Sequence, residues 1–125
     1  MTNNWYESDI FKGDQTGRTI NFPTVNLDAT ILSPDFKQGI YAASVIYNNQ
    51  VFKGALYFGP RLVMDETKNV LEIFIVDFDK EIYGESIKFQ IKDFIRGIQN
   101  FSSLEEMKIQ LKKDVEQVEK SMSSA

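Results

Sequence analysis

Two runs with strand periodicity, joined by an Asn-Asn pair, constrain the fold of this chain more than any other feature. The runs are GIYAASVIY at 39–47 and QVFKGALYF at 50–58, and both have the period of two that is typical of β-strands. Asn48 and Asn49 lie between them, and asparagine tolerates a positive φ better than most residues. We therefore predict a tight β-hairpin over residues 39–58.

Two later runs predict further strands. Residues 70–78, VLEIFIVDF, are apolar on both faces, which indicates a central strand. The run at 86–95 alternates apolar residues with polar ones. One of its faces is therefore expected to lie in the core and the other, which includes Gln90, to face solvent.

The periodicity changes to that of a helix near the C-terminal end. Apolar residues recur at helical spacing at Leu104, Met107, Leu111, Val115, Val118 and Met122. Ser102 followed by Glu105 matches a capping box, which marks a helix start. We predict one amphipathic helix from about Ser103 to about Lys120, with its apolar stripe on the sheet and a frayed tail at 121–125.

Length and composition predict one globular domain over residues 1–125, since the chain is long enough for one core and 42% of its residues are hydrophobic. Several short strands followed by a terminal helix favour a small, mainly β, antiparallel barrel with the helix across it. The net charge of −4 argues against a protein that mainly grips nucleic acid or an anionic membrane. No apolar run approaches the length of a membrane span and the first residues lack a signal peptide, so we expect a cytoplasmic protein.

The chain contains no cysteine and no histidine. This composition excludes thiol nucleophiles, histidine bases, disulfides and the usual zinc sites. Any catalysis must therefore use carboxylates, hydroxyls, Arg or Lys side chains and an oxygen-ligated metal. Phosphoryl transfer fits this set, because it depends on positioning, Mg²⁺ and a single base.

Residues 13–26, GDQTGRTINFPTVN, combine loop-forming, charged and metal-ligating side chains. Pro23 favours an extended backbone before it, so Thr24 and Asn26 should project to the same side. A hydroxyl and an amide oxygen side by side suit Mg²⁺, which prefers oxygen ligands. The alternative is a β-turn in which these two side chains bond local backbone, and composition alone favours that turn.

The glycines of the same loop predict an anion site. Gly13 and Gly17 would let backbone N–H groups approach an anion closely, and Arg18 would supply positive charge beside it. A phosphate group and its Mg²⁺ would then meet in this loop.

Glu72 lies in the predicted strand 70–78, on the same alternating face as three apolar residues. An ionised carboxylate among apolar neighbours is costly unless it is paired, hydrogen-bonded or near water, and such positions are enriched in function. An equally supported alternative is that Glu72 lies in the first turn of the strand and reaches solvent. Asp77 and Asp79 form a second acidic pair, for which we prefer capping of the following turn over a metal site.

Together these segments resemble the riboflavin kinase (flavokinase) family, which also forms the C-terminal half of bacterial bifunctional FAD synthetases. The matching segments are 13–26, 39–42, 71–84, 95–96 and 100–117, in family order and spacing. The resemblance implies ATP-dependent, Mg²⁺-assisted phosphorylation of the riboflavin 5′-hydroxyl to give FMN and ADP. It also implies a six-stranded antiparallel Greek-key barrel with a C-terminal α-helix. The alternative function is a flavin- or nucleotide-binding module of this fold with little or no kinase turnover.

The resemblance also implies roles for individual residues. Glu72 matches the catalytic carboxylate, and Thr24 and Asn26 match the Mg²⁺ ligands. The residues that match ATP-binding positions are Gly13, Arg18, Thr24, Asn26, Ile75, Asp77 and Tyr83. Arg96 and Phe101 match flavin-side positions. The expected partners are therefore riboflavin or FMN and ATP or ADP. We expect the chain to be a monomer that binds neither nucleic acid nor a membrane.

The chain departs from the family pattern in three places. Ile20 and Asn21 stand where many relatives carry Leu-Gly before Phe-Pro-Thr. Residues 57–62 lack the usual family sequence, which leaves that loop without an assigned role. Residues 97–100 lack the charges that usually follow Arg96, and we expect flavin to order this segment. No adenylyltransferase domain precedes the match, so we expect the chain not to make FAD from FMN by itself.

Overall fold

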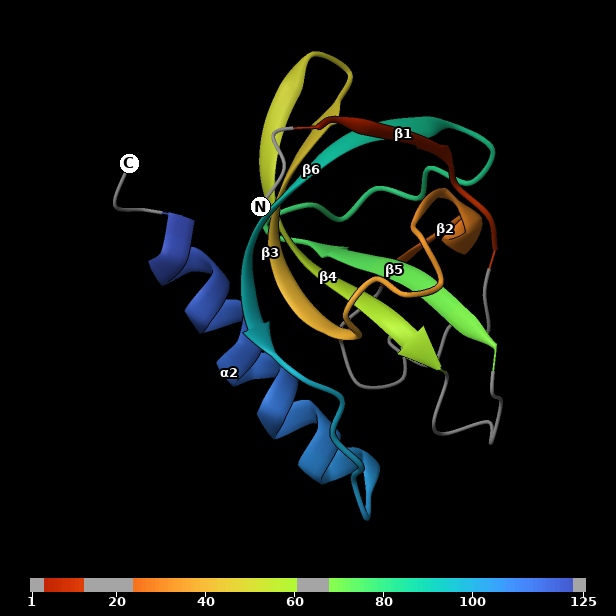
Figure 1. The fold of residues 1–125 in the computed structure, drawn as a ribbon. Coiled ribbons are helices and arrows are strands. Elements are labelled where there is room, and N and C mark those ends of the chain that lie inside the picture. The colour runs from red at the N-terminus through yellow and green to blue at the C-terminus, as the bar shows by residue number, and fades with distance from the viewer. Residues whose placement is uncertain (1–3, 13–23, 61–67, 123–125) are drawn as a thin grey trace.

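The computed structural model describes residues 4–12, 24–60 and 68–122, which form one antiparallel sheet and a C-terminal helix (Figure 1). The strands are β1 Tyr6–Asp9, β2 Val25–Leu27, β3 Gly39–Tyr47, β4 Gln50–Pro60, β5 Asn69–Ile75 and β6 Ser86–Arg96. Their order in the sheet is β1-β6-β3-β4-β5-β2. A short 3₁₀ helix, η1 Ala29–Ile31, follows β2, and the last element is α2 Leu104–Met122. The prediction of six antiparallel strands with a C-terminal helix is confirmed.

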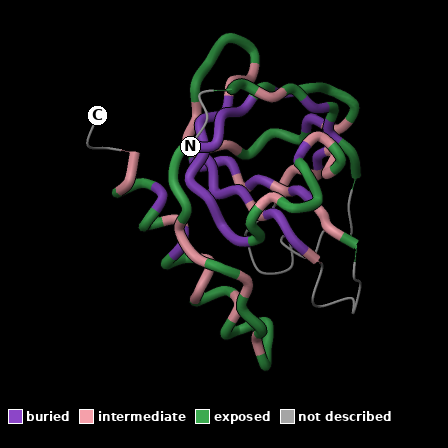
Figure 2. Tube along the Cα trace, in the orientation of Figure 1, coloured by how far each residue is buried: buried purple, intermediate pink, exposed green. Residues whose placement is uncertain are grey.

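The sheet curls into a nearly closed barrel. Beyond β1, Phe11 forms an isolated antiparallel bridge with Asn26 of β2, and the Phe11 N–H donates to the Asn26 carbonyl oxygen at 2.8 Å. This bridge brings the two ends of the strand order together. Inward-pointing side chains fill the interior, among them Tyr41, Val45, Leu56, Phe58, Leu71, Ile73 and Phe89. Figure 2 accordingly shows the buried part of the chain concentrated on the strands.

The predicted hairpin is also confirmed. β3 and β4 are paired up to Tyr47, which lies opposite Gln50. Asn48 and Asn49 connect the two strands with φ values of 51° and 64°. A two-residue type I′ turn needs a positive φ at both central residues, and asparagine adopts that conformation at low cost.

The ends and faces of β5 and β6 differ in detail from the prediction. β5 is a central strand between β4 and β2, but it ends at Ile75 and not at Phe78. The backbone turns at Asp77, whose φ is 58°, and this turn ends the ladder. On β6, Gln90 is buried, and it pairs with the equally buried Ser44 of β3. The outer face of β6 is therefore not open to solvent at this point.

The N-cap of α2 lies one residue later than the predicted capping box places it. The Glu106 N–H donates to Ser103 Oγ at 3.1 Å, so Ser103 is the N-cap residue. Ser103 directly precedes the first helical residue, which is why its hydroxyl reaches the third N–H of the helix. The Ser102 hydroxyl instead donates to the Glu106 carboxylate.

α2 lies across the outer face of β3, β4 and β6 (Figure 1). Val118 is buried against Ala42 of β3 and Ala55 of β4, whose small side chains let the helix approach closely. The helix extends to Met122, so residues 121–122 are helical and do not belong to a frayed tail. Within the described ranges, no helix has the length and apolar character needed to cross a membrane.

Two residues on α2 depart from the predicted apolar stripe. Leu104 is 42% exposed, because it lies in the first turn of the helix, where the chain has only just left the barrel. Asp114 is buried, at 1% exposure, although it carries a charge. A charged side chain at that depth needs a partner, and the next subsection describes it.

Candidate active site

A row of paired residues crosses five strands of the barrel. Asn26 of β2 pairs with Glu72 of β5, and Glu72 pairs with Tyr57 of β4. Tyr57 pairs with Ile40 of β3, and Ile40 pairs with Arg96 of β6. Side chains of directly paired residues lie on the same face of a sheet. The alternate residues point into the core, so this row lies on the outer face of the barrel.

Thr24, Asn26 and Glu72 meet at one end of this row. Thr24 directly precedes β2, and its Oγ1 donates a hydrogen bond to Glu72 Oε1 at 2.7 Å. Asn26 lies directly opposite Glu72. The Thr24 hydroxyl thus reaches a residue 48 positions away and does not form the local turn that composition favoured. Glu72 is half-buried on the strand and does not lie in its first turn.

The other residues expected around the nucleotide have different surroundings. Gly13 and Arg18 lie outside the described residues. Ile75 is the last residue of β5, and its side chain is buried in the barrel core. Only the backbone of Ile75 can therefore face a ligand. Asp77 is exposed in the turn after β5, and Tyr83 is partly buried against the core in the connection to β6.

Arg96 and Phe101, the expected flavin-side residues, lie at the end of β6 and in the segment after it. The Arg96 guanidinium carbon is 5.9 Å from the centre of the Phe101 ring, a separation within the range of a cation–π contact. Arg96 Nη1 donates to the carbonyl oxygen of Gly97 at 2.9 Å. The guanidinium therefore contacts both the beginning and the end of residues 97–101, which we call the connecting segment.

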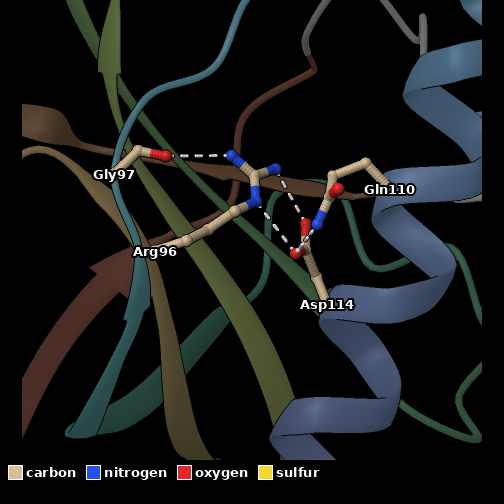
Figure 3. Close-up of polar contacts among 4 residues, drawn as sticks. All are labelled: Arg96, Gly97, Gln110 and Asp114. Carbon is tan, nitrogen blue, oxygen red and sulfur yellow. Dashed lines mark hydrogen bonds and ion pairs between the residues drawn. The ribbon is translucent and has the colours of Figure 1, made fainter.

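The partner of the buried Asp114 is Arg96 (Figure 3). Arg96 Nε donates to Asp114 Oδ1 at 2.9 Å and Arg96 Nη2 to Asp114 Oδ2 at 2.8 Å. Gln110, one turn earlier on α2, donates to Asp114 Oδ1 at 3.0 Å. Asp114 was not among the residues predicted from the sequence. Its signal was an acidic residue at a position of the helical stripe, between Leu111 and Val118.

The connecting segment also lies against the end of β4, close to the row described above. A Cβ atom on Gly59 would lie 2.7 Å from Ile98 Cδ1 and 3.2 Å from the Tyr57 hydroxyl oxygen. Ile98 therefore occupies the space that a side chain at position 59 would need. The Tyr57 hydroxyl donates to the carbonyl oxygen of Pro60, further along the same strand. The segment that was expected to depend on flavin for its order thus has contacts of its own with the barrel.

Comparison with known proteins shows to which family the chain is related. The sequence model of the Flavokinase family, described as riboflavin kinase, matches residues 3–122. The chain is 38% identical over 112 residues to an RNA-binding riboflavin kinase of Bacillus subtilis, covering 89% of this chain and 48% of that protein. It is 32% identical over 108 residues to a bifunctional riboflavin kinase/FMN adenylyltransferase of Haemophilus influenzae, covering 86% of this chain and 35% of that protein.

The solved structures agree with the sequence comparison at the level of the fold. A riboflavin kinase from Trypanosoma brucei superposes with a TM-score of 0.67 at 20% identity, covering 94% of this chain and 78% of that one. The chain spans about half or less of the length of the curated relatives named above. The match of the family model over nearly all residues shows that the chain belongs to the riboflavin kinase family.

Proposed function

We propose that this chain transfers the γ-phosphoryl group of ATP to the 5′-hydroxyl of riboflavin, giving FMN and ADP. The observation that carries the proposal is the hydrogen bond between Thr24 and Glu72, beside the paired Asn26. It brings together a hydroxyl, a carboxylate and an amide, which are the groups that a metal-assisted phosphoryl transfer uses. Membership of the riboflavin kinase family supports the choice of acceptor.

Glu72 is the proposed general base. In the reaction, the riboflavin 5′-oxygen forms a bond to the γ-phosphorus, the bond from that phosphorus to the β–γ bridging oxygen breaks, and ADP leaves. The proton of the 5′-hydroxyl passes to the Glu72 carboxylate. Thr24 holds one oxygen of that carboxylate at 2.7 Å, which orients the base before substrate arrives.

The side chains of Thr24 and Asn26 fit a Mg²⁺ ion. The Thr24 hydroxyl donates its hydrogen bond to Glu72, so the lone pairs of its oxygen remain available to a cation. In the described part of the chain, no group of three or more Asp, Glu, His or Cys side chains is placed to hold a metal. Neutral oxygen ligands suit an ion that shares its coordination with phosphate and water. When bound, Mg²⁺ would neutralise charge on the phosphoryl group during transfer.

The remaining residues are assigned to the two substrates. Asp77 and Tyr83, with the backbone of Ile75, are proposed for the nucleotide, together with Gly13 and Arg18 of the loop outside the described residues. The proposed flavin-side residues, Arg96 and Phe101, lie at the opposite end of the row from Asn26, with Glu72 between the two ends. A base between a nucleotide side and a flavin side is the arrangement that transfer between the two substrates requires.

The decisive test is incubation of the purified protein with riboflavin and Mg-ATP, followed by chromatography for FMN. FMN that accumulates in proportion to protein concentration is the expected result. A flavin-binding module without turnover would bind riboflavin but form no FMN. The half-buried Glu72 favours the enzyme, because binding alone gives no reason for a carboxylate beside Thr24.

We also propose that the chain acts as a cytoplasmic monomer without nucleic acid. The net charge of −4 supports this proposal, because binding to a phosphate backbone relies on positive charge. RNA binding is part of the name of the Bacillus subtilis relative, of which this chain covers 48%. Gel filtration tests whether the chain is a monomer, and a mobility-shift assay with RNA tests whether it binds nucleic acid.

Replacing Thr24 by valine is expected to weaken binding of Mg-ADP about ten- to hundredfold while changing riboflavin binding little. The substitution keeps the shape of the side chain and removes the oxygen that the metal and Glu72 share. A hydrogen bond or ligand to a charged group is worth about that factor. Asn26→Ala is expected to act in the same direction, and calorimetric titration with and without EDTA measures both.

Thr30→Val is the matched control for this prediction. Its hydroxyl also donates to a carboxylate, that of Asp28, but at an exposed position of the η1 helix and without contact to Glu72 in that bond. Nucleotide affinity in this variant should equal that of the wild type. Affinity for ADP that needs no metal and survives Thr24→Val would contradict the proposed metal ligands.

A further inference from the structure

We propose that Asp114 is a positioning residue for flavin, which fixes the Arg96 guanidinium so that its remaining N–H groups meet the carbonyl edge of the isoalloxazine ring. The inference rests on the proposed function and extends it to α2, the helix outside the barrel. Asp114 contacts no substrate in this proposal. It acts through Arg96, whose guanidinium donates a hydrogen bond to each of its carboxylate oxygens.

The geometry of the pair leaves Arg96 little freedom. Two parallel N–H···O bonds fix the plane of a guanidinium as well as its position. Gln110 donates to the same Asp114 oxygen that accepts from Arg96 Nε, which holds the carboxylate in turn (Figure 3). The Asp114 side chain is 2% exposed and that of Arg96 is 17% exposed. The carboxylate is therefore sealed, whereas part of Arg96 reaches the surface where a ligand can approach.

The hydrogen-bonding capacity of Arg96 is only partly used. A guanidinium has five N–H groups, and the bonds to Asp114 and Gly97 use three of them among the described residues. One of the remaining two belongs to Nη1 and the other to Nη2. The Phe101 ring lies 5.9 Å from the guanidinium carbon. Paired donors beside an aromatic face match a flat ring system that has carbonyl oxygens along one edge, as isoalloxazine has.

Stability alone does not explain the pair. The buried cluster between α2 and the barrel is otherwise apolar, formed around Val118, Ala42 and Ala55. Replacing a buried ion pair by apolar residues of similar size is often neutral or stabilising, because it avoids the cost of desolvating two charges. A buried pair in such a surface is therefore better explained by a need to orient Arg96 than by a need to attach the helix.

The first test is Asp114→Asn, which keeps the size of the side chain but has only one oxygen to accept from the guanidinium. We expect the KM for riboflavin to rise about ten- to hundredfold, with kcat and the KM for ATP close to wild type. Ser121→Ala is the matched control. It removes another hydrogen bond between α2 and β6, to Asp93, at the far end of the helix, and should leave all three constants unchanged.

The second test separates orientation from folding. The double variant Arg96→Met, Asp114→Leu replaces the ion pair by an apolar pair, and its melting temperature should stay within a few degrees of the wild type. Its KM for riboflavin should nevertheless rise as it does in Asp114→Asn. In a cycle of Arg96→Lys and Asp114→Asn, the effects on that KM should not add, because Asp114 acts through Arg96.

Riboflavin affinity, measured in parallel by quenching of flavin fluorescence, keeps this inference distinct from the proposed function. A wild-type protein that forms no FMN would end the kinase proposal, whereas weaker riboflavin binding by Asp114→Asn would still support the role of Asp114. Wild-type riboflavin affinity in a folded apolar double variant would overturn the inference. So would additive effects in the cycle, or an Asp114→Asn variant that lowers kcat and leaves the KM for riboflavin unchanged.

Discussion

Glu72→Gln is expected to lower the rate of FMN formation by about 10²–10⁴-fold, the usual effect of removing a general base. The amide has nearly the same shape as the carboxylate, and its oxygen can still accept the Thr24 hydrogen bond. What it loses is the ability to take the proton of the riboflavin 5′-hydroxyl. Mg-ADP binding and the melting temperature should therefore stay close to wild type while turnover, measured by chromatography of FMN, nearly stops.

Glu116→Gln is the matched control for the Glu72 prediction. It makes the same chemical change at an exposed position of α2, and turnover should be unaffected. Turnover near the wild-type rate in Glu72→Gln would remove the general-base assignment. A large fall in its melting temperature would show instead that the carboxylate is structural.

Gly39→Ala is expected to destabilise the protein by about 2–5 kcal/mol, combining backbone strain with overpacking. Gly39 has a φ of 151°, and a Cβ atom there would lie 2.3 Å from the carbonyl oxygen of Arg96 and 2.8 Å from the Phe94 ring. Relief by a backbone shift is difficult, because β3 is paired with β4 on one side and β6 on the other. Chemical denaturation measures the change in the free energy of unfolding.

Gly97→Ala provides the comparison, since it lies one residue beyond Arg96 and a Cβ atom there meets nothing within 4 Å. This variant should be as stable as the wild type or slightly more stable, because alanine restricts the unfolded chain. Equal stability of the Gly39 and Gly97 variants would show that β3 can move away from β6. In that case the Gly39→Ala protein should also bind riboflavin more weakly, since the clash is with the backbone of Arg96.

The sequence predicted the four longest strands and the hairpin well because the signals were local. Positive φ values at Asn48 and Asn49 follow from their side chains, and the pairing of β3 with β4 follows from the turn. Element ends were less predictable. The apolar run continues past Ile75, so the sequence pattern does not mark the end of β5. The strand ends where the backbone turns at Asp77, which has a positive φ. The N-cap lies one residue later than predicted because the sequence has two serines and two glutamates in tandem, and periodicity does not distinguish a shift of one residue.

In the candidate site, too, local features could be predicted from the sequence and long-range contacts could not. The shared direction of Thr24 and Asn26 follows from local backbone geometry, but their meeting with Glu72 depends on the pairing of β2 with β5. That pairing joins segments far apart in the sequence and was not predicted; the family resemblance implied only that the three residues serve one site. Asp114 could be noticed as a charge within an apolar stripe, yet its partner is specified by how the helix lies on the barrel.

The bridge between Phe11 and Asn26 places the candidate site where the two ends of the strand order meet, which we call the seam of the barrel. β2 pairs with β5 over three residues, and in the described part of the chain its other edge is joined to the β1 side at this bridge. A nucleotide held by Thr24 and Asn26 would bind only while β2 is in place. Its binding free energy would therefore also oppose opening of the barrel at this point. The Phe11 amide, which donates to Asn26, should therefore exchange its hydrogen more slowly when Mg-ADP is bound. In this fold, closure of the barrel at β2 and binding of the phosphate donor would therefore stabilise each other.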